Sequence, residues 1–174
     1  MIAVHARQND QPVVREFFEL FKTPWEFFAP GVHADVLLCA ADEIPANSAR
    51  LVVIYGSGLN SFDRAQSAAV RPQGAGKTIS HGEKSFPIYG SSLAFENSAN
   101  PALLEVKTGE QTIVRIGYDL FLEIRHLLTV GQPPAHAATP TLERHIGLLR
   151  EIIDRKSTRL NSSHHAISRM PSSA

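Results

Sequence analysis

Two apolar runs decide the fold class of this chain: Asp35-Val36-Leu37-Leu38-Cys39-Ala40 and Arg50-Leu51-Val52-Val53-Ile54-Tyr55. Neither run alternates apolar with polar residues, which indicates strands that are buried on both faces of a sheet. The linker between them, residues 41–49, contains Pro45 and is too short for a full crossover helix. The pattern predicts an α/β fold with a mixed, partly parallel sheet and flanking helices.

Three amphipathic segments are predicted to be those helices. Each has apolar residues at helical spacing and a small polar residue in front that can cap the first turn. The segments are residues 11–22 after Asp10, residues 120–130 after Asp119, and a third helix that begins at Pro140 after Thr139. Proline suits the first turn of a helix, where its missing N–H costs nothing.

An antiparallel hairpin is predicted toward the C-terminal part of the sheet. Residues 103–107 and 111–116 are strand-like, and Thr108-Gly109-Glu110 between them supplies the positive φ that a tight turn needs. Residues 56–76, by contrast, are polar and rich in Gly, Ser, Arg and Gln. We predict a loop there, without a helix at residues 59–62.

The last 21 residues resemble translated sequencing adapter rather than protein. Two blocks, residues 154–164 and 168–174, match one frame of a common short-read library adapter in the right order. We therefore expect a single α/β domain over residues 1–153, cut at its C-terminal end, and a disordered artefactual tail over residues 154–174. Without the tail the chain has 13 basic and 16 acidic residues, a net charge near −3.

The composition argues against several kinds of partner and compartment. A mildly acidic domain without clustered Lys and Arg argues against nucleic acid, because phosphate neutralisation needs such clusters. No apolar run approaches the roughly 20 residues that span a membrane, and the N-terminus turns polar too soon for a signal peptide. We expect a cytoplasmic protein, and the lone Cys39 excludes an internal disulfide.

The motif Gly74-Ala75-Gly76-Lys77-Thr78 resembles part of a phosphate-binding loop. The first glycine of such a loop is missing, because Arg71 stands in its place. A buried strand in front and a helix behind are also missing, and both are needed to converge backbone amides on a phosphate. A loop without nucleotide is the favoured interpretation.

Trp25, Tyr55 and Ser57 are the candidate ligand contacts. Trp25 lies in an aromatic segment, for which core packing is favoured over a platform that stacks on carbohydrate. Tyr55-Gly56-Ser57-Gly58 follows a buried strand, where α/β folds often bind ligands. This motif lacks the third glycine of a dinucleotide fingerprint and the Gly-x-Ser-x-Gly of a nucleophile elbow. Glycines that turn the chain off the sheet explain it better.

The titratable residues do not form a recognisable catalytic or metal-binding pattern. No two of the six histidines before residue 154 have the three- or four-residue spacing of ligands on one helical face. Asp119, Glu123 and Arg125 suggest acid–base chemistry, but a helix cap and a solvated face explain them equally well. We expect no catalytic residue, metal or cofactor in this fragment.

One stretch resembles a known family. It is Arg115-Ile116-Gly117-Tyr118-Asp119-Leu120-Phe121-Leu122-Glu123-Ile124-Arg125-His126-Leu127-Leu128, followed by Gly131-Gln132. This pattern is similar to the N-terminal accessory region of certain bacterial polysaccharide deacetylase-like proteins. Residues 141–150 are similar to the helix that follows there, and residues 86–90 to an extended segment. The resemblance covers residues 87–153.

The resemblance implies a non-catalytic domain in front of a metal-dependent polysaccharide deacetylase domain beyond Ile153. In such proteins the following domain uses a His/Asp-bound metal to activate water against an N-acetyl group. Its motifs do not occur in this chain, so the fragment is expected to be inactive and to position the missing C-terminal catalytic domain or contact polysaccharide.

Two alternative hypotheses for the function remain open. One is a free-standing α/β ligand-binding or regulatory module that uses the loop after Tyr55. The other is a small hydrolase with a dispersed site that includes His81 and Ser57. In the first case the chain would act without a catalytic partner domain, and in the second it would be an enzyme itself.

Overall fold

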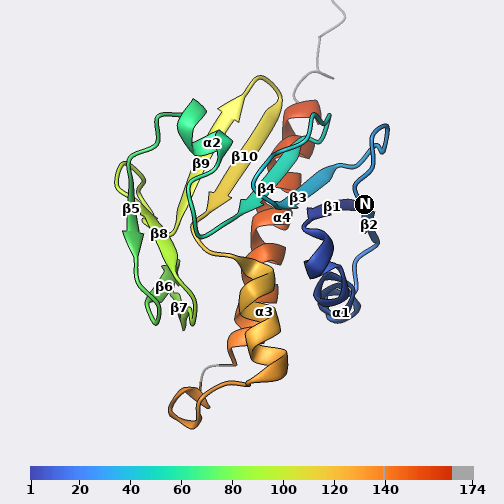
Figure 1. Ribbon diagram of the computed structural model, residues 1–174. Helices are drawn as coiled ribbons and strands as arrows, with labels where there is room; N and C mark the ends of the chain where they lie inside the picture. The colour runs from blue at the N-terminus through green and yellow to red at the C-terminus, as the bar shows by residue number, and fades with distance from the viewer. Residues whose placement is uncertain (139, 166–174) are drawn as a thin grey trace, which may run out of the picture.

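The structure is a computed structural model that describes residues 1–138 and 140–165, with side chains as far as Lys156. Its centre is a six-stranded sheet with the strand order β2-β1-β3-β4-β10-β9 (Figure 1). Neighbouring strands are parallel, except for the antiparallel hairpin of β9 and β10. The strands are β1 (Ile2–Ala6), β2 (Trp25–Phe27), β3 (Val36–Ala40), β4 (Leu51–Tyr55), β9 (Leu103–Thr108) and β10 (Gln111–Ile116). The predicted α/β class, with its mixed sheet and hairpin, is confirmed.

The central strands β3 and β4 are buried on both faces, as their apolar runs predicted. Side chains alternate between the faces of a strand, so Leu38 and Val53 belong to one core cluster. Leu37 and Val52, their neighbours in sequence, belong to a second cluster on the other face. The sheet therefore separates two apolar cores.

The three longer helices pack on one face of the sheet, called here the helical face. They are α1 (Gln11–Phe21), α3 (Leu120–Thr129) and α4 (Thr141–His165). In Figure 1, α1 and α3 lie below the strands and α4 lies behind them. Phe17, Phe121 and Leu149 of these helices are fully buried in the core cluster that contains Leu38. This is the predicted arrangement of flanking helices.

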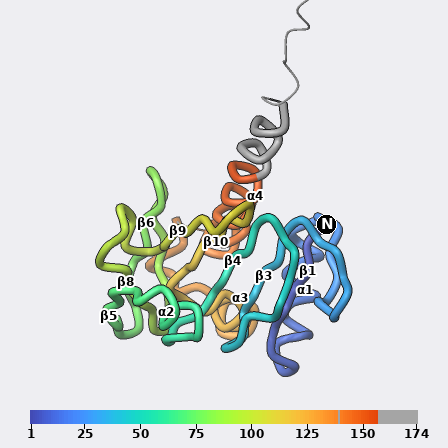
Figure 2. The backbone as a smooth tube through the Cα atoms, turned by 90° about the horizontal axis from the view of Figure 1, so that it is seen from above, coloured from blue at the N-terminus to red at the C-terminus, as the bar shows by residue number. Residues whose placement is uncertain are grey.

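The other face is called here the loop-covered face. In the described part of the chain it is covered by loop residues 28–34 and 41–49 and by the single-turn helix α2 (Ser61–Ala65). Phe62 of α2 and Ala49 of the second loop are buried against Val52 and Ile54. Figure 2 shows α2, β5 (Val70–Gln73) and β8 (Ser92–Phe95) at the β9 end of the sheet, with α1 at the opposite end.

Residues 56–76 are more ordered than their polar composition suggested. They contain α2 and β5, and β5 pairs antiparallel with β8. A hairpin of β6 (Thr78–His81) and β7 (Lys84–Pro87) follows. The prediction that no helix begins at residues 59–62 is wrong, because a five-residue helix is too short to show an apolar period. Its signal is the capping box that Asn60 forms with Asp63.

Of the predicted helix caps, Asp119 is confirmed and Asp10 is wrong. Asp119 caps α3, since its Oδ1 accepts a hydrogen bond from the Leu122 N–H at 3.0 Å. Asp10 makes no capping bond to α1 and instead pairs with Arg125 at 2.7 Å. Thr139, the predicted cap of the third helix, lies outside the described residues.

The helix α4 continues through Asp154 to His165, into the adapter-like segment where the sequence predicted no ordered structure. Two ion pairs support the first turn of this extension. Arg155 lies 2.6 Å from Glu151 one turn earlier, and the Lys156 ammonium lies 2.6 Å from Glu105 of β9. The origin of these residues stays a prediction.

Candidate functional site

The carboxyl ends of the parallel strands β1, β3, β4 and β10 meet at one edge of the sheet. The chain leaves β1 through α1 to β2 on one side, while β3 pairs on the other side, so the direction of winding changes between β1 and β3. Open α/β sheets bind ligands at such a switch point, outside the carboxyl ends of the strands. A ligand-binding site is therefore expected at this edge of the sheet.

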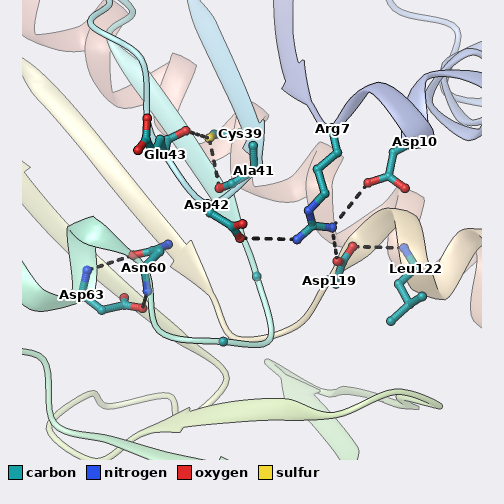
Figure 3. Close-up of polar contacts among 12 residues, drawn as sticks. Arg7, Asp10, Cys39, Ala41, Asp42, Glu43, Asn60, Asp63, Asp119 and Leu122 are labelled. Carbon is teal, nitrogen blue, oxygen red and sulfur yellow. Dashed lines mark hydrogen bonds and ion pairs between the residues drawn. The ribbon is translucent and has the colours of Figure 1, made fainter.

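Arg7, which follows β1, lies at the centre of a charged network at this edge. Figure 3 shows its guanidinium between Asp42, Asp119 and Asp10. Its Nη1 lies 2.8 Å from Asp119 Oδ2 and 3.4 Å from Asp10 Oδ2, and its Nη2 lies 3.6 Å from Asp42 Oδ1. The hydrogen bond with Asp119 is the largest cause that raises the pKa of Arg7 above its usual value.

Arg115 of β10 holds the loop after β4 through hydrogen bonds to its carbonyl groups. All five N–H groups of this buried guanidinium donate hydrogen bonds. Nε and Nη2 each donate to one carboxylate oxygen of Asp63 at 2.9 Å. Nη1 donates to the Gly56 carbonyl at 2.8 Å and to the Ile116 carbonyl. The second N–H of Nη2 donates to the Gly58 carbonyl at 2.9 Å. A planar guanidinium suits this convergence of acceptors. The loop is therefore held to the sheet by its own carbonyl groups.

Asn60 and Asp63 complete this arrangement at the start of α2. The Asn60 side chain accepts a hydrogen bond from the Asp63 N–H at 2.9 Å, and Asp63 Oδ2 accepts one from the Asn60 N–H at 3.1 Å. Figure 3 shows the two side chains facing each other across the first turn. Asp63 thus joins the helix cap and the ion pair with Arg115, and both groups are buried.

The charges at this edge compensate one another, with an excess of carboxylates. Asp10, Asp42 and Asp119 face Arg7, and Asp10 also pairs with Arg125. Such a surface disfavours phosphate and other anions. In residues 1–138 and 140–165, no three His, Cys, Asp or Glu side chains lie close enough together to hold a metal ion. The Arg7 network therefore forms a polar rim in which charged side chains pair with one another.

The structure does not bring the three predicted contact residues together. Ser57 lies half-exposed at the carboxyl edge. Tyr55 is buried on the helical face, with its ring 5.4 Å from that of Tyr118, and burial raises the pKa of its hydroxyl. Trp25 lies at the opposite edge, beside the first residues of β1, and stacks on Phe18 at 4.9 Å. Trp25 is partly buried and packs against the core cluster of the helical face, as the favoured interpretation expects, and a glycan contact of Trp25 stays a prediction.

A hollow of about 300 Å³ beside α3 was not predicted from the sequence. It is called here the Tyr89 hollow, and its lining consists of Tyr89, Gly90, Leu122, Glu123, Arg125, His126 and Thr129. Glu123 is only 1% exposed, so the solvated face predicted for it is wrong. Its carboxylate accepts hydrogen bonds from the N–H groups of Tyr89 at 2.9 Å and Gly90 at 2.7 Å. Burial raises the pKa of Glu123 above its usual value.

His145 is a second group whose role the sequence did not reveal. It lies fully buried between α4 and the sheet, where its Nδ1 lies 2.9 Å from the Tyr118 hydroxyl and its ring packs against Phe86. Burial lowers its pKa to about 3. The imidazole is therefore neutral and belongs to the core.

The helices of the described chain do not combine the length and apolarity that crossing a bilayer requires. A comparison of the chain with protein-family models, curated proteins and solved structures found no match.

Proposed function

We propose that this chain is a non-catalytic accessory domain of a polysaccharide deacetylase-like protein, and that it positions a catalytic domain against its loop-covered face. The observation that carries the proposal is the asymmetry of the sheet. Three helices cover one face, whereas loops and one short helix cover the other. Sheets made mostly of parallel strands are normally covered on both faces.

The loop-covered face retains apolar side chains that are only partly buried. They come from both loops and from the β9–β10 hairpin, and they are Phe28, Val32, Ala34, Ile44, Leu104, Val106 and Ile113. A partner domain that covers them would complete the second layer of the fold. Interfaces between domains of one chain form in this way, by burial of apolar surface that each domain leaves partly open.

The β9 end of this face also has a hollow of about 230 Å³. It is lined by one face of β9, the end of β8 and the segment after α2, with Ala68, Ala69, Phe95, Leu104 and Val106 among its residues. The lining is largely apolar and lies at the rim of the sheet. A hollow of this kind accepts an apolar side chain of a docking partner.

The free-standing ligand-binding module is less well supported. That alternative relies on the loop after Tyr55, but the carbonyls of Gly56 and Gly58 in this loop already bond Arg115. The surrounding network carries excess negative charge and holds its own cations in ion pairs. Docking through the partly buried apolar side chains of the loop-covered face is therefore the function that the geometry supports best.

Hydrogen–deuterium exchange tests the proposal. The chain would be compared with a longer protein from the same gene that includes the region encoded downstream. We expect slower exchange in β9 and in residues 28–34 and 41–49 of the longer protein, and loss of this protection on Val106→Lys. Lys107→Ala, on the same strand but directed to the other face, is the matched control. Protection confined to α1 and α3, or no metal-dependent deacetylase downstream, would contradict the proposal.

A further inference from the structure

We infer that the Tyr89 hollow binds one ring of a neutral saccharide. This inference goes beyond the docking role and concerns a different surface, on the helical side of the sheet. The volume of about 300 Å³ lies at the lower end of the range of small-molecule sites, about 300–1,000 Å³. A ligand of one or two sugar rings suits that size.

One wall of the hollow is a rigid apolar surface. The Tyr89 ring stacks on the His126 imidazole, with centroids 4.8 Å apart and planes 24° apart. The Tyr89 hydroxyl lies 3.1 Å from His136 Nδ1, which fixes the orientation of the ring. Leu122, one turn before His126 on α3, is 45% exposed and continues this wall. The C–H face of a pyranose ring packs on such surfaces, where an apolar body meets polar tips.

The charged groups that line the hollow already have hydrogen-bond partners within the protein. The Arg125 guanidinium donates to Asp10 at 2.7 Å and to the Asn9 carbonyl at 3.0 Å. Both oxygens of Glu123 accept backbone N–H groups. The guanidinium of Arg125 and both carboxylate oxygens of Glu123 are thus already occupied by hydrogen bonds, so they favour a neutral ligand over a phosphate or a polycation.

The polar atoms that remain suit hydroxyl groups. The described residues supply no hydrogen-bond partner for the ring nitrogens of His126. The Thr129 hydroxyl donates to the Arg125 carbonyl at 2.7 Å and keeps its own oxygen lone pairs as acceptors. A sugar hydroxyl donates and accepts at once, so it matches this mixture of donors and acceptors.

Gly90 keeps the hollow open. A Cβ atom at Gly90 would lie 3.0 Å from Glu123 Oε1 and 3.5 Å from Leu122 Cδ2. Any larger residue would push the carboxylate or Leu122 into the space that a ligand needs. The close approach of the Gly90 backbone to α3 thus sets the shape of the site as well as its hydrogen bonds.

Two exposed leucines of α3 give a matched test. Leu122 lines the hollow and Leu128 does not, yet they are 45% and 42% exposed, so either can change to serine without loss of core packing. The chain would be titrated with cellobiose, chitobiose and adenosine while its backbone amide resonances are followed by NMR. We expect millimolar saccharide binding that shifts the resonances of Gly90 and His126.

The variants decide between outcomes. Leu122→Ser should weaken saccharide binding by about fivefold or more, whereas Leu128→Ser should bind like the unaltered chain. Equal affinity of the two variants, shifts centred on Trp25 instead, tighter binding of adenosine, or no binding of either disaccharide would each overturn the inference. Val106→Lys separates it from the docking proposal, because that change should leave saccharide binding intact.

Discussion

Arg115 and Asp63 form a bidentate ion pair in which both side chains are fully buried. Nε and Nη2 of the arginine each lie 2.9 Å from one carboxylate oxygen, across 52 residues of sequence. The pair ties β10 to the start of α2, and the remaining donors of Arg115 hold the loop after β4. A polar segment is thereby ordered on the loop-covered face.

Asp63→Ala should destabilise the fold by about 3–5 kcal/mol, because it leaves the Arg115 guanidinium buried without its counter-charge. Equilibrium unfolding in urea measures the loss. The matched control is Asp35→Ala, which removes exposed ion pairs with Arg50 and with the N-terminal ammonium and should change stability by less than about 1 kcal/mol. Similar effects of the two substitutions would show that the buried pair does not hold the fold.

The separation of these two residues explains why the sequence predicted some parts of the fold and not others. The apolar runs of β3 and β4, the turn at Gly109 and the Asp119 cap are local signals, and each appears as predicted. The Asn60–Asp63 capping box is also local, and closer attention to that spacing would reveal α2. The partner of Asp63, by contrast, is visible only once the sheet is formed.

The candidate sites divide in the same way. The position of Ser57 at the carboxyl edge follows from the buried strand before it. The Tyr89 hollow depends on Glu123, which lies 34 residues from Tyr89 in sequence and reaches its backbone only in the folded chain. An acid on α3 looks solvent-exposed when its helix is considered alone, so burial of Glu123 could not be predicted from helical spacing.

Two glycines should respond to alanine in opposite directions. A Cβ atom at Gly117 would overlap the carbonyl oxygen of Leu93. The backbones are this close because the Leu93 N–H donates a hydrogen bond to the Gly117 carbonyl at 2.6 Å. Gly117→Ala should therefore destabilise the fold by several kcal/mol or prevent folding, since backbone must move. Gly147 lies within α4 with open space around it, so Gly147→Ala should stabilise by up to about 1 kcal/mol. Thermal unfolding distinguishes the two, and a neutral Gly117→Ala would contradict the close approach.

The buried His145 should make the fold sensitive to acid. Its pKa is about 3 in the folded chain, against about 6.5 when exposed, so the unfolded state binds more protons between these values. The contribution of His145 to the free energy of unfolding is thus fully present above about pH 6.5 and decreases as the pH falls toward 3. Glu123, whose pKa is raised, acts in the opposite direction, so the test must compare variants.

His145→Gln isolates this effect in urea unfolding at several pH values. It should lower stability at pH 7 by loss of packing, and it should flatten the decline between pH 6.5 and 4. His33→Gln is the control, because His33 is exposed and should leave the pH profile unchanged. An unchanged acid decline in His145→Gln would assign the pH dependence to other groups.

Asp119 has two functions that substitution can separate. Its Oδ1 accepts the Leu122 N–H at 3.0 Å as the cap of α3, and its Oδ2 accepts from Arg7 Nη1 at 2.8 Å. Asparagine retains one oxygen for the cap but loses the charge, whereas alanine loses both. Because a cap contributes about 1 kcal/mol to stability and the half-exposed ion pair with Arg7 contributes less, Asp119→Ala should lower the free energy of unfolding clearly more than Asp119→Asn.

A double-mutant cycle with Arg7→Ala measures the ion pair alone, and its coupling energy should decrease with added salt. If asparagine cost as much as alanine and the coupling resisted salt, the ion pair rather than the cap would dominate, and the Arg7 network would be a stabilising element instead of a polar rim.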